Sequence, residues 1–431
     1  MAVEQAARAA TGSPLPNARH LEFAIVGTNH RHAPIHVRER LARDASVRRL
    51  MASIEAHASV SARLLLSTCN RIELWFLGTL PDPLGFRHEL ASSLDAAPET
   101  FYIRTGSAAI EHAVRVASGM DSMAWGEPQI GAQVLESLSV AEANGWTERE
   151  LSELVRKVSA AAGHIRRAAH VPVNTGSAGD AAVNLILSRL SAGVSRVLVV
   201  GTGKMGRLAA RRLASSVDLT ISDRSPAKAD TLAHTLGARS LPLSESVDRL
   251  REFDAVIVAT SAPRAVLTAE RVTASVATRA APILVIDLSV PRNVDPEVSQ
   301  APGVELLNLD DLEPWATPPE GNIIEHAEDA IRLEAGRLTA WLRSRAADDT
   351  VARLRERAEA IRREELSAAS RRLPGLPPEA RAVLEKMTER IVNRLLHDPT
   401  QAIRAKAADG TASKEYARLV RNLFGLREDA Q

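Results

Sequence analysis

One stretch of the chain restricts its fold more than any other: an apolar run that leads directly into a glycine-rich turn. RVLVV at 196–200 is followed by GTGKMG at 201–206, a segment with helical character, and a second apolar run, DLTIS, at 218–222. This order of strand, Gly-x-Gly-x-x-Gly turn, helix and strand is typical of a dinucleotide-binding unit, and the flanking strands make it far more specific than the glycines alone. Glycines let the backbone approach a pyrophosphate at the helix N-terminus. We therefore predict a Rossmann domain whose cofactor site is formed by Gly201, Thr202, Gly203, Lys204, Met205 and Gly206.

The residues that follow the second strand bear on which dinucleotide binds. Asp223 would accept a hydrogen bond from a free ribose 2′-hydroxyl, which favours NAD. Arg224 and Ser225 would instead hold a 2′-phosphate, which favours NADP. A surface Asp–Arg pair without selectivity is a third interpretation. These residues leave the choice of cofactor open.

The length of the chain, 431 residues, predicts several domains, because single hydrophobic cores rarely grow beyond about 250–300 residues. We expect a flexible tail at 1–20, an α/β domain at 21–170, the Rossmann domain at 171–315 and a helical region at 316–431. In the α/β domain we predict strands at 21–27, 63–67 and 72–77, a turn at Thr28 and Asn29, a helix at 35–41, and helical segments over 107–165 with breaks at Gly119 and 126–128.

The later part of the chain shows two further patterns. A hinge is predicted at 171–179, then a helix at 180–190, with additional strands of a parallel sheet at 255–259 and 283–287. Beyond residue 319 the pattern is helical, and Ile324, Ile331 and Leu338 repeat every seven residues, as in a long helix with a packing seam. Helical character resumes over 379–404.

Composition excludes some classes of protein. The chain is 45% hydrophobic and 25% charged, as in globular proteins, and its formal net charge of +1 argues against DNA binding through an overall basic surface. No 18-residue apolar run is present, so no membrane span is expected, and the first twenty residues lack the hydrophobic core of a signal peptide. A single cysteine excludes an internal disulfide framework and predicts a reducing, cytoplasmic setting. We predict no metal site.

That single cysteine, Cys69, is the first candidate catalytic residue. It follows a predicted strand and lies between Thr68, Asn70 and Arg71. A strand-to-turn position exposes a side chain at a sheet edge, and the Arg71 cation would favour the reactive thiolate. Free cysteines are often buried in cores, so an inert core sulfur is the alternative.

Other polar residues could complete a site around the cysteine. His112 lies in a predicted helix; such a histidine is usually structural, but a thiol nucleophile needs a base or proton donor nearby. The segment 117–134 is rich in polar residues, and Gln129 and Gln133 would share one helix face if the helix begins near Pro128. Its candidate substrate-binding residues are Ser122, Glu127, Pro128, Gln129 and Gln133; a capped helix start is the alternative explanation.

Together these residues resemble the glutamyl-tRNA reductase family over about 22–404. The resemblance is carried in order by GTNH…AP at 27–34, STCNRIE at 67–73, His112 with RVASGMDS, GEPQI at 126–130, GTGKMG, DLSVPRNVDP at 287–296 and IVNRLLHDP at 391–399.

The resemblance implies an NADPH-dependent oxidoreductase that converts glutamyl-tRNA(Glu) to glutamate-1-semialdehyde, the first step of tetrapyrrole biosynthesis. It implies that Cys69 forms a thioester with the glutamyl group, that His112 is needed for activity, and that glutamate is bound by Thr68, Cys69, Asn70, Arg71, Ser122, Glu127, Pro128, Gln129 and Gln133. Arg71 would be the partner of a carboxylate. It further implies a long spinal helix, a C-terminal dimerisation domain, a homodimer, and a glutamate-1-semialdehyde aminomutase that receives the aldehyde.

The chain departs from the family pattern at several positions. Trp125 and the pair Gly131–Ala132 replace leucine and Leu-Gly, and Asp180 replaces a serine of the hinge. Asp223-Arg224-Ser225 replaces Asn-Arg-Thr, which bears on the NADPH preference. None of these changes removes a proposed catalytic group.

Two other functions stay open from the sequence. A divergent or regulatory relative could bind charged tRNA or cofactor without turnover, although a protein that only binds needs no nucleophile such as Cys69. A thiol-dependent reductase of a small acyl compound is the other, and the helical C-terminal region gives it little support. Binding to tRNA should weaken as salt rises. A basic cluster is formed by arginines at 353, 355, 357, 362, 363, 371 and 372. Glutamates interleave this cluster, which is typical of a solvated helix face.

Overall fold

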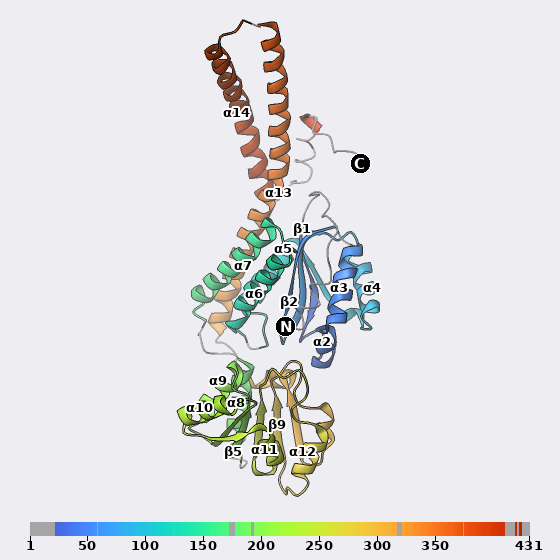
Figure 1. Cartoon of the computed structure of the whole chain (residues 1–431), viewed down its shortest axis with the longest axis vertical. Helices are drawn as coiled ribbons and strands as arrows, with labels where there is room; N and C mark the ends of the chain where they lie inside the picture. The colour runs from blue at the N-terminus through green and yellow to red at the C-terminus, as the bar shows by residue number, and fades with distance from the viewer. Residues whose placement is uncertain are drawn as a thin grey trace. The chain divides into compact units, whose positions relative to one another are not determined.

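The computed structural model describes residues 22–57, 59–123, 125–171, 177–190, 194–316, 321–373, 375–409, 419 and 422–424. The expected tail at 1–20 and most of the expected hinge at 171–179 lie outside these residues. The described chain divides into two compact units, one ending at Arg332 and the other beginning at Leu333 (Figure 1). None of the helices in the described ranges combines the length and apolar character that a membrane span needs.

The N-terminal part of the first unit contains a four-stranded antiparallel sheet. Its order is β2-β3-β1-β4, with β1 at Glu22–Asn29, β2 at Ser59–Ser67, β3 at Arg71–Thr79 and β4 at Tyr102–Thr105. The central strand β3 is buried over almost its whole length, which explains its apolar sequence. The helices around the sheet are α2 (Ile35–Leu41), α3 (Asp44–His57), α4 (Pro83–Ser93), α5 (Gly106–Ala117), α6 (Gln129–Ala143) and α7 (Arg149–Ala168). Helices α5 and α6 lie on one side of the sheet and α3 and α4 on the other (Figure 1).

Most of the predicted elements of this region are confirmed, but one turn was wrong. Thr28 and Asn29 belong to β1, where they pair with Ile72 and Arg71 of β3. The ladder to β3 therefore overrides the local turn preference of these polar residues. The predicted helical segments over 107–165 are α5, α6 and α7, and the predicted breaks at Gly119 and 126–128 fall between α5 and α6, as expected. The sequence did not predict the break between α6 and α7, nor α3, α4 and β4.

The second part of the first unit is a Rossmann domain with a six-stranded parallel sheet of order β10-β9-β8-β5-β6-β7. The chain runs from β5 outward to β7, then crosses over and runs from β8 outward to β10. The reversal lies between β5 and β8, and ligands of such sheets bind at this point, beyond the carboxyl ends of the strands. The strands are β5 (Arg196–Val200), β6 (Asp218–Asp223), β7 (Arg239–Pro242), β8 (Ala255–Val258), β9 (Ile283–Asp287) and β10 (Val304–Asn308).

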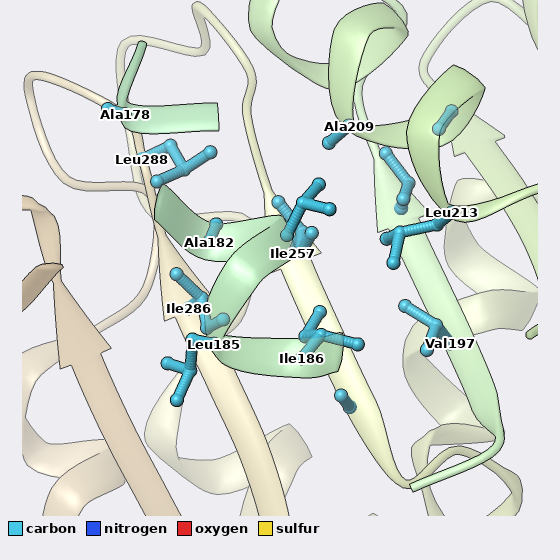
Figure 2. Close-up of a cluster of buried hydrophobic side chains, with 14 of the residues drawn as sticks. Ala178, Ala182, Leu185, Ile186, Val197, Ala209, Leu213, Ile257, Ile286 and Leu288 are labelled. Atoms are coloured by element: carbon cyan, nitrogen blue, oxygen red, sulfur yellow. The ribbon is translucent and has the colours of Figure 1, made fainter. Parts of the chain in front are cut away.

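Helices cover both faces of this sheet and bury its apolar strands. The residues of one face form a large core cluster with α8 (Ala178–Ser188), α9 (Lys204–Leu213) and α10 (Pro226–Leu236); the other face packs on α11 (Leu243–Asp248) and α12 (Ala269–Val276). Figure 2 shows the first cluster, with Leu185 and Ile186 of α8 gathered against Ile257 and Ile286 of the sheet. Asp180, a departure from the family pattern, completes a capping box with Ser177 at the start of α8.

The second unit is helical. The long helix α13 (Gly321–Arg372) has 52 residues and continues from the first unit into the second, and α14 (Pro378–Asp409) runs back beside it (Figure 1). Val351 and Leu354 of α13 pack with Leu396 and Ile403 of α14. The long helix is thereby confirmed. Glu359 pairs with both Arg362 and Arg363. Arg363 is 74% exposed, as on the solvated face that the interleaved glutamates indicated, whereas Arg362 is 15% exposed and donates to Thr388 of α14.

Candidate active site

Cys69 lies at the tip of the hairpin that joins β2 and β3. Ser67 pairs with Ile72, and the Thr68 N–H donates to the Arg71 carbonyl at 2.9 Å, so Cys69 and Asn70 are the two connecting residues. Thr68 Oγ1 also accepts from the backbone N–H groups of Asn70 and Arg71, at 3.2 and 3.3 Å. The threonine therefore shapes the turn that carries the cysteine.

The surroundings of the Cys69 sulfur are apolar. The half-buried cysteine packs against the core cluster shown in Figure 2, whose members include Ile35, Met123 and Leu288. Burial raises the pKa of the thiol to about 12, and the Glu127 carboxylate acts in the same direction, whereas Arg38 and Arg71 act against it. Arg71 therefore favours the thiolate, as expected, but in the free protein desolvation outweighs the effect of the nearby cations.

The Arg71 side chain points away from solvent into a carboxylate pair. Its guanidinium is 1% exposed, and its Nη1 donates to Glu73 Oε1 at 2.8 Å and to Asp121 Oδ2 at 3.0 Å. Its Nη2 donates to the Asp121 carbonyl. Arg71 is therefore held by this chain's own acidic groups, so it is not a free cation in this structure.

Glu73 is the centre of the buried polar network and was not singled out from the sequence. Its side chain is fully buried, and its Oε1 accepts from Arg71, from the Tyr102 hydroxyl and from His112 Nε2 at 3.0 Å. Its Oε2 accepts from Trp75 Nε1 at 2.6 Å. The cationic partners hold the pKa of Glu73 far below its ordinary value despite burial. A charged residue within an otherwise apolar strand was the sequence signal that could have identified it.

The network joins two of the predicted site residues but does not reach the sulfur. His112 of α5 and Arg71 share Glu73 Oε1, and the His112 ring also packs against Tyr102 at 5.2 Å between centroids. Both Cys69 and His112 are described, and the structure forms no hydrogen bond between their side chains. His112 is therefore linked to Arg71 through Glu73, and this network does not include the Cys69 side chain.

The other predicted substrate residues lie along the start of α6 and the loop before it. Helix α6 begins at Gln129, so Gln129 and Gln133 share one helix face, as predicted. Ser122 follows Asp121, the Arg71 partner, and is buried. Burial raises the pKa of the Glu127 carboxyl, with Lys204 and Arg71 acting against the rise. Within the described ranges, no side-chain hydrogen bond joins Ser122, Gln129 or Gln133 to the Cys69 turn.

The three glycines of the loop after β5 have different surroundings. A Cβ on Gly201 would lie 2.3 Å from the Ala259 carbonyl oxygen, and one on Gly206 would lie 2.0 Å from the Gly201 carbonyl oxygen. Gly201 also has φ +107°, which L side chains rarely adopt. A Cβ on Gly203 would meet only one protein atom, at 3.9 Å. Gly201 and Gly206 are thus required by the fold, while Gly203 leaves space for a ligand to approach the backbone, as a pyrophosphate needs.

Asp223 at the end of β6 is engaged within the protein. Its Oδ2 accepts from the backbone N–H and the hydroxyl of Thr202, both at 2.8 Å, and its Oδ1 accepts from the Ser225 N–H at 2.9 Å. These hydrogen bonds lower the pKa of Asp223 against the effect of burial. Arg224 is exposed and forms no ion pair with another described residue. The glycine loop is therefore anchored by Asp223, and the neighbouring cation is free.

Three family models match successive parts of the chain. The model of the glutamyl-tRNAGlu reductase N-terminal domain matches residues 26–169, and that of the glutamyl-tRNAGlu reductase dimerisation domain matches residues 326–426. Between them, the shikimate/quinate 5-dehydrogenase model matches residues 184–315. With the glycine loop, this match supports a dinucleotide cofactor.

Relatives and a solved structure match over nearly the whole length. The glutamyl-tRNA reductase of Syntrophotalea carbinolica is 34% identical over 432 residues, covering 95% of this chain and 96% of the relative. The glutamyl-tRNA reductase of Salinispora arenicola is 34% identical over 425 residues, covering 94% and 92%. The structure of glutamyl-tRNA reductase from Methanopyrus kandleri aligns with a TM-score of 0.50 and 28% identity, covering 94% of this chain and 99% of that one.

Proposed function

The chain belongs to the glutamyl-tRNA reductase family, and from this premise we propose that it reduces the glutamyl group of glutamyl-tRNA(Glu) to glutamate-1-semialdehyde in the cytoplasm. The observation that carries the proposal is the position of Cys69, at the tip of a hairpin and against the core of the dinucleotide-binding domain. A nucleophile there is shared by two domains, one for the substrate and one for the cofactor. The comparisons offer no support for a relative that binds without turnover.

In the first half of the reaction, the Cys69 sulfur attacks the ester carbonyl carbon. A carbon–sulfur bond forms, the bond to the ribose oxygen of the tRNA breaks, and the thiol proton ends on that oxygen. The resulting thioester is a better hydride acceptor than an ester, and its thiolate leaves readily. Because burial keeps the free thiol protonated, its activation depends on substrate binding. His112 is our candidate for proton transfer, with Glu73 holding its Nε2 side.

In the second half, a bound dinucleotide would supply hydride to the thioester carbonyl carbon. The Gly203 backbone would approach its pyrophosphate, with Lys204 and Met205 beginning helix α9. We propose NADPH as the cofactor. Arg224 is an exposed cation suited to a 2′-phosphate, with Ser225 beside it. The Asp223 carboxylate, which would bind a free ribose hydroxyl, already accepts hydrogen bonds from Thr202 and Ser225. Collapse of the reduced adduct then breaks the carbon–sulfur bond and releases the aldehyde.

The glutamyl group would be held by the residues around the Cys69 turn and the start of α6. Thr68 and Asn70 frame the turn, and Arg71 would act as an organiser of Glu73 and Asp121 unless substrate displaces one of these carboxylates. The remaining candidates are Ser122, Glu127, Pro128, Gln129 and Gln133.

The central test compares the wild-type protein with Cys69→Ser. Both are incubated with glutamyl-tRNA and either NADPH or NADH, and semialdehyde is measured. We expect aldehyde only from the wild type, and a glutamyl adduct on Cys69 by mass spectrometry when cofactor is left out. Aldehyde formation by Cys69→Ser at the wild-type rate would refute the mechanism.

Arg224→Ala tests the choice of cofactor. Removing the cation should lower kcat/KM for NADPH at least tenfold and leave that for NADH nearly unchanged, because only NADPH carries the 2′-phosphate. An equal loss with both cofactors would show that Arg224 does not read that group.

We further propose a homodimer formed through α14. Val383, Met387, Ile391 and Leu395 recur every four residues, so they form one apolar stripe, and each is at least 47% exposed within the single chain. Ile391→Asp should convert a dimer into a monomer in sedimentation experiments, whereas Lys386→Asp, off the stripe, should not. An aminomutase that takes up the aldehyde is the partner we expect in addition.

A further inference from the structure

We propose that two ion pairs between helix α2 and the dinucleotide-binding domain position Cys69 for the hydride-transfer half of the reaction, and are not needed for thioester formation. The pairs are Arg38–Asp310 and Glu39–Arg292. The inference rests on the proposed function, and it assigns positioning residues that lie outside the substrate and cofactor sites described above.

The Arg38–Asp310 pair joins a buried arginine to a partly exposed carboxylate through two hydrogen bonds. Arg38 is 2% exposed; its Nη2 donates to Asp310 Oδ1 at 2.8 Å and its Nη1 donates to Asp310 Oδ2 at 3.2 Å. The Ile35 N–H at the start of α2 donates to the same Oδ2 at 2.8 Å. Asp310 thus binds both the Arg38 side chain and the backbone at the start of α2. The first turn of a helix is a favourable place for a carboxylate.

The Glu39–Arg292 pair attaches α2 to the loop that follows β9 in the dinucleotide-binding domain. Arg292 Nε lies 3.1 and 3.0 Å from the two carboxylate oxygens of Glu39, and the Arg292 backbone N–H also donates to Oε1. The loop itself is rigidly held, because the buried Asp287 carboxylate accepts from the N–H groups of Ser289, Asn293 and Val294. Helix α2 is therefore attached to a preformed structure.

Both partner residues follow the carboxyl ends of neighbouring parallel strands. Arg292 comes after β9 and Asp310 after β10. This is the edge of the sheet at which dinucleotides bind in the Rossmann fold. The two ion pairs therefore hold α2 on the cofactor edge of the domain.

The Cys69 turn is coupled to α2 through the core of the dinucleotide-binding domain. Ile35 belongs to the core cluster of the dinucleotide-binding domain, and Cys69 packs against that cluster. The turn is also joined to the segment between β1 and α2, since the His30 N–H donates to the Asn70 carbonyl at 3.0 Å. If the ion pairs are broken, the apolar contacts of Ile35, Met123 and Cys69 with this cluster remain to hold the turn against the dinucleotide-binding domain.

The two halves of the reaction have different geometric needs. Thioester formation requires Cys69, the ester and the proposed substrate and proton-transfer residues, all of which belong to the N-terminal domain. Hydride transfer requires the thioester carbonyl and the cofactor edge to be within contact, and misplacement by about 1 Å can slow such a step about a hundredfold. Loss of the ion pairs should therefore affect the second half alone.

The experiment uses Asp310→Asn and Glu39→Gln, which keep side-chain size, and Asp218→Asn as a matched control. Asp218 pairs with Arg239 within the dinucleotide-binding domain, and both side chains are more than half exposed. Thioester formation is measured as release of uncharged tRNA without cofactor, and hydride transfer as a single turnover after NADPH is added. The rate of alkylation of Cys69 by iodoacetamide, without substrate or cofactor, gives a third readout, and it reports one site because the chain has one cysteine.

For Asp310→Asn we expect thioester formation within twofold of wild type, hydride transfer at least tenfold slower, and alkylation at least fivefold faster. Glu39→Gln should change the same quantities in the same direction, and Asp218→Asn should change none. Equal loss of both half-reactions, or an unchanged alkylation rate, would overturn the proposal. If the wild type forms no thioester, the proposed function fails, while the alkylation comparison still tests the positioning role.

Discussion

Replacing Glu73 with glutamine removes one charge from the buried network but leaves the size of the side chain nearly unchanged. The native carboxylate accepts four hydrogen bonds, from Arg71, Trp75, Tyr102 and His112. A glutamine amide has one acceptor oxygen, and its NH₂ group would face donors. Arg71, itself 1% exposed, would keep Asp121 as its only charged partner.

The magnitude follows from burial. Removing one partner of a buried ion pair costs about 3–5 kcal/mol, because the other charge stays desolvated. Asp121 remains to compensate Arg71, so we expect the lower end, about 3 kcal/mol. The control is Glu305→Gln: Glu305 forms a similar two-bonded pair with Arg189, at 3.0 and 3.1 Å, but both side chains are about 40% exposed. Exposed pairs contribute about 0–1 kcal/mol.

Urea unfolding followed by tryptophan fluorescence and circular dichroism measures both variants. With slopes of about 1.5–3 kcal/mol/M, Glu73→Gln should lower the midpoint of the N-terminal domain transition by about 1–2 M, and Glu305→Gln should shift its own transition by less than about 0.7 M. A shift for Glu73→Gln no larger than that for Glu305→Gln would refute the reasoning, since the network would then be no more than a solvated ion pair.

Three other predictions concern the thiol, a histidine and the glycine loop. Because the pKa of Cys69 is raised to about 12, the rate of its alkylation without substrate should rise about tenfold per pH unit from pH 7 to 10. Glu127→Gln should increase this rate, and a rate that levels off near pH 9 would contradict the raised pKa. Burial and the Arg31 cation lower the pKa of His30 from 6.5 to about 4, so the unfolded chain binds more protons between these values and stability falls as pH falls. From pH 7 to 5 the free energy of unfolding should drop by about 2 kcal/mol more in wild type than in His30→Gln, measured by urea titration; parallel pH profiles would be inconsistent with a neutral buried ring. Gly203→Ala should leave the thermal midpoint nearly unchanged and weaken dinucleotide binding at least tenfold in calorimetry, whereas Gly206→Ala should lower the midpoint by several degrees. A lower midpoint for Gly203→Ala together with an unchanged midpoint for Gly206→Ala would show that the roles of these glycines are misassigned.

Although the two edge strands, β7 and β10, were not predicted, local patterns in the sequence were sufficient for four of the six Rossmann strands, the glycine loop and the long C-terminal helix. Each depends on residues close in the chain: the run at 196–200 is apolar because both faces of β5 are covered, and a Gly-x-Gly-x-x-Gly turn forms within six residues. The position of Cys69 after a strand could likewise be read locally, and so could the family, from motifs in a fixed order.

Only the tertiary structure decided how the candidate residues meet. Arg71 lies two residues from Cys69, and the sequence suggested a cation beside a sulfur. The fold instead turns Arg71 to Asp121, fifty residues away, and leaves the sulfur against an apolar cluster. Asp223 was ambiguous until its bonds to Thr202 became visible, and Arg38–Asp310 joins residues 272 positions apart. Hydrogen bonds and desolvation depend on which side chains come together in space, and no local pattern records distances of that kind.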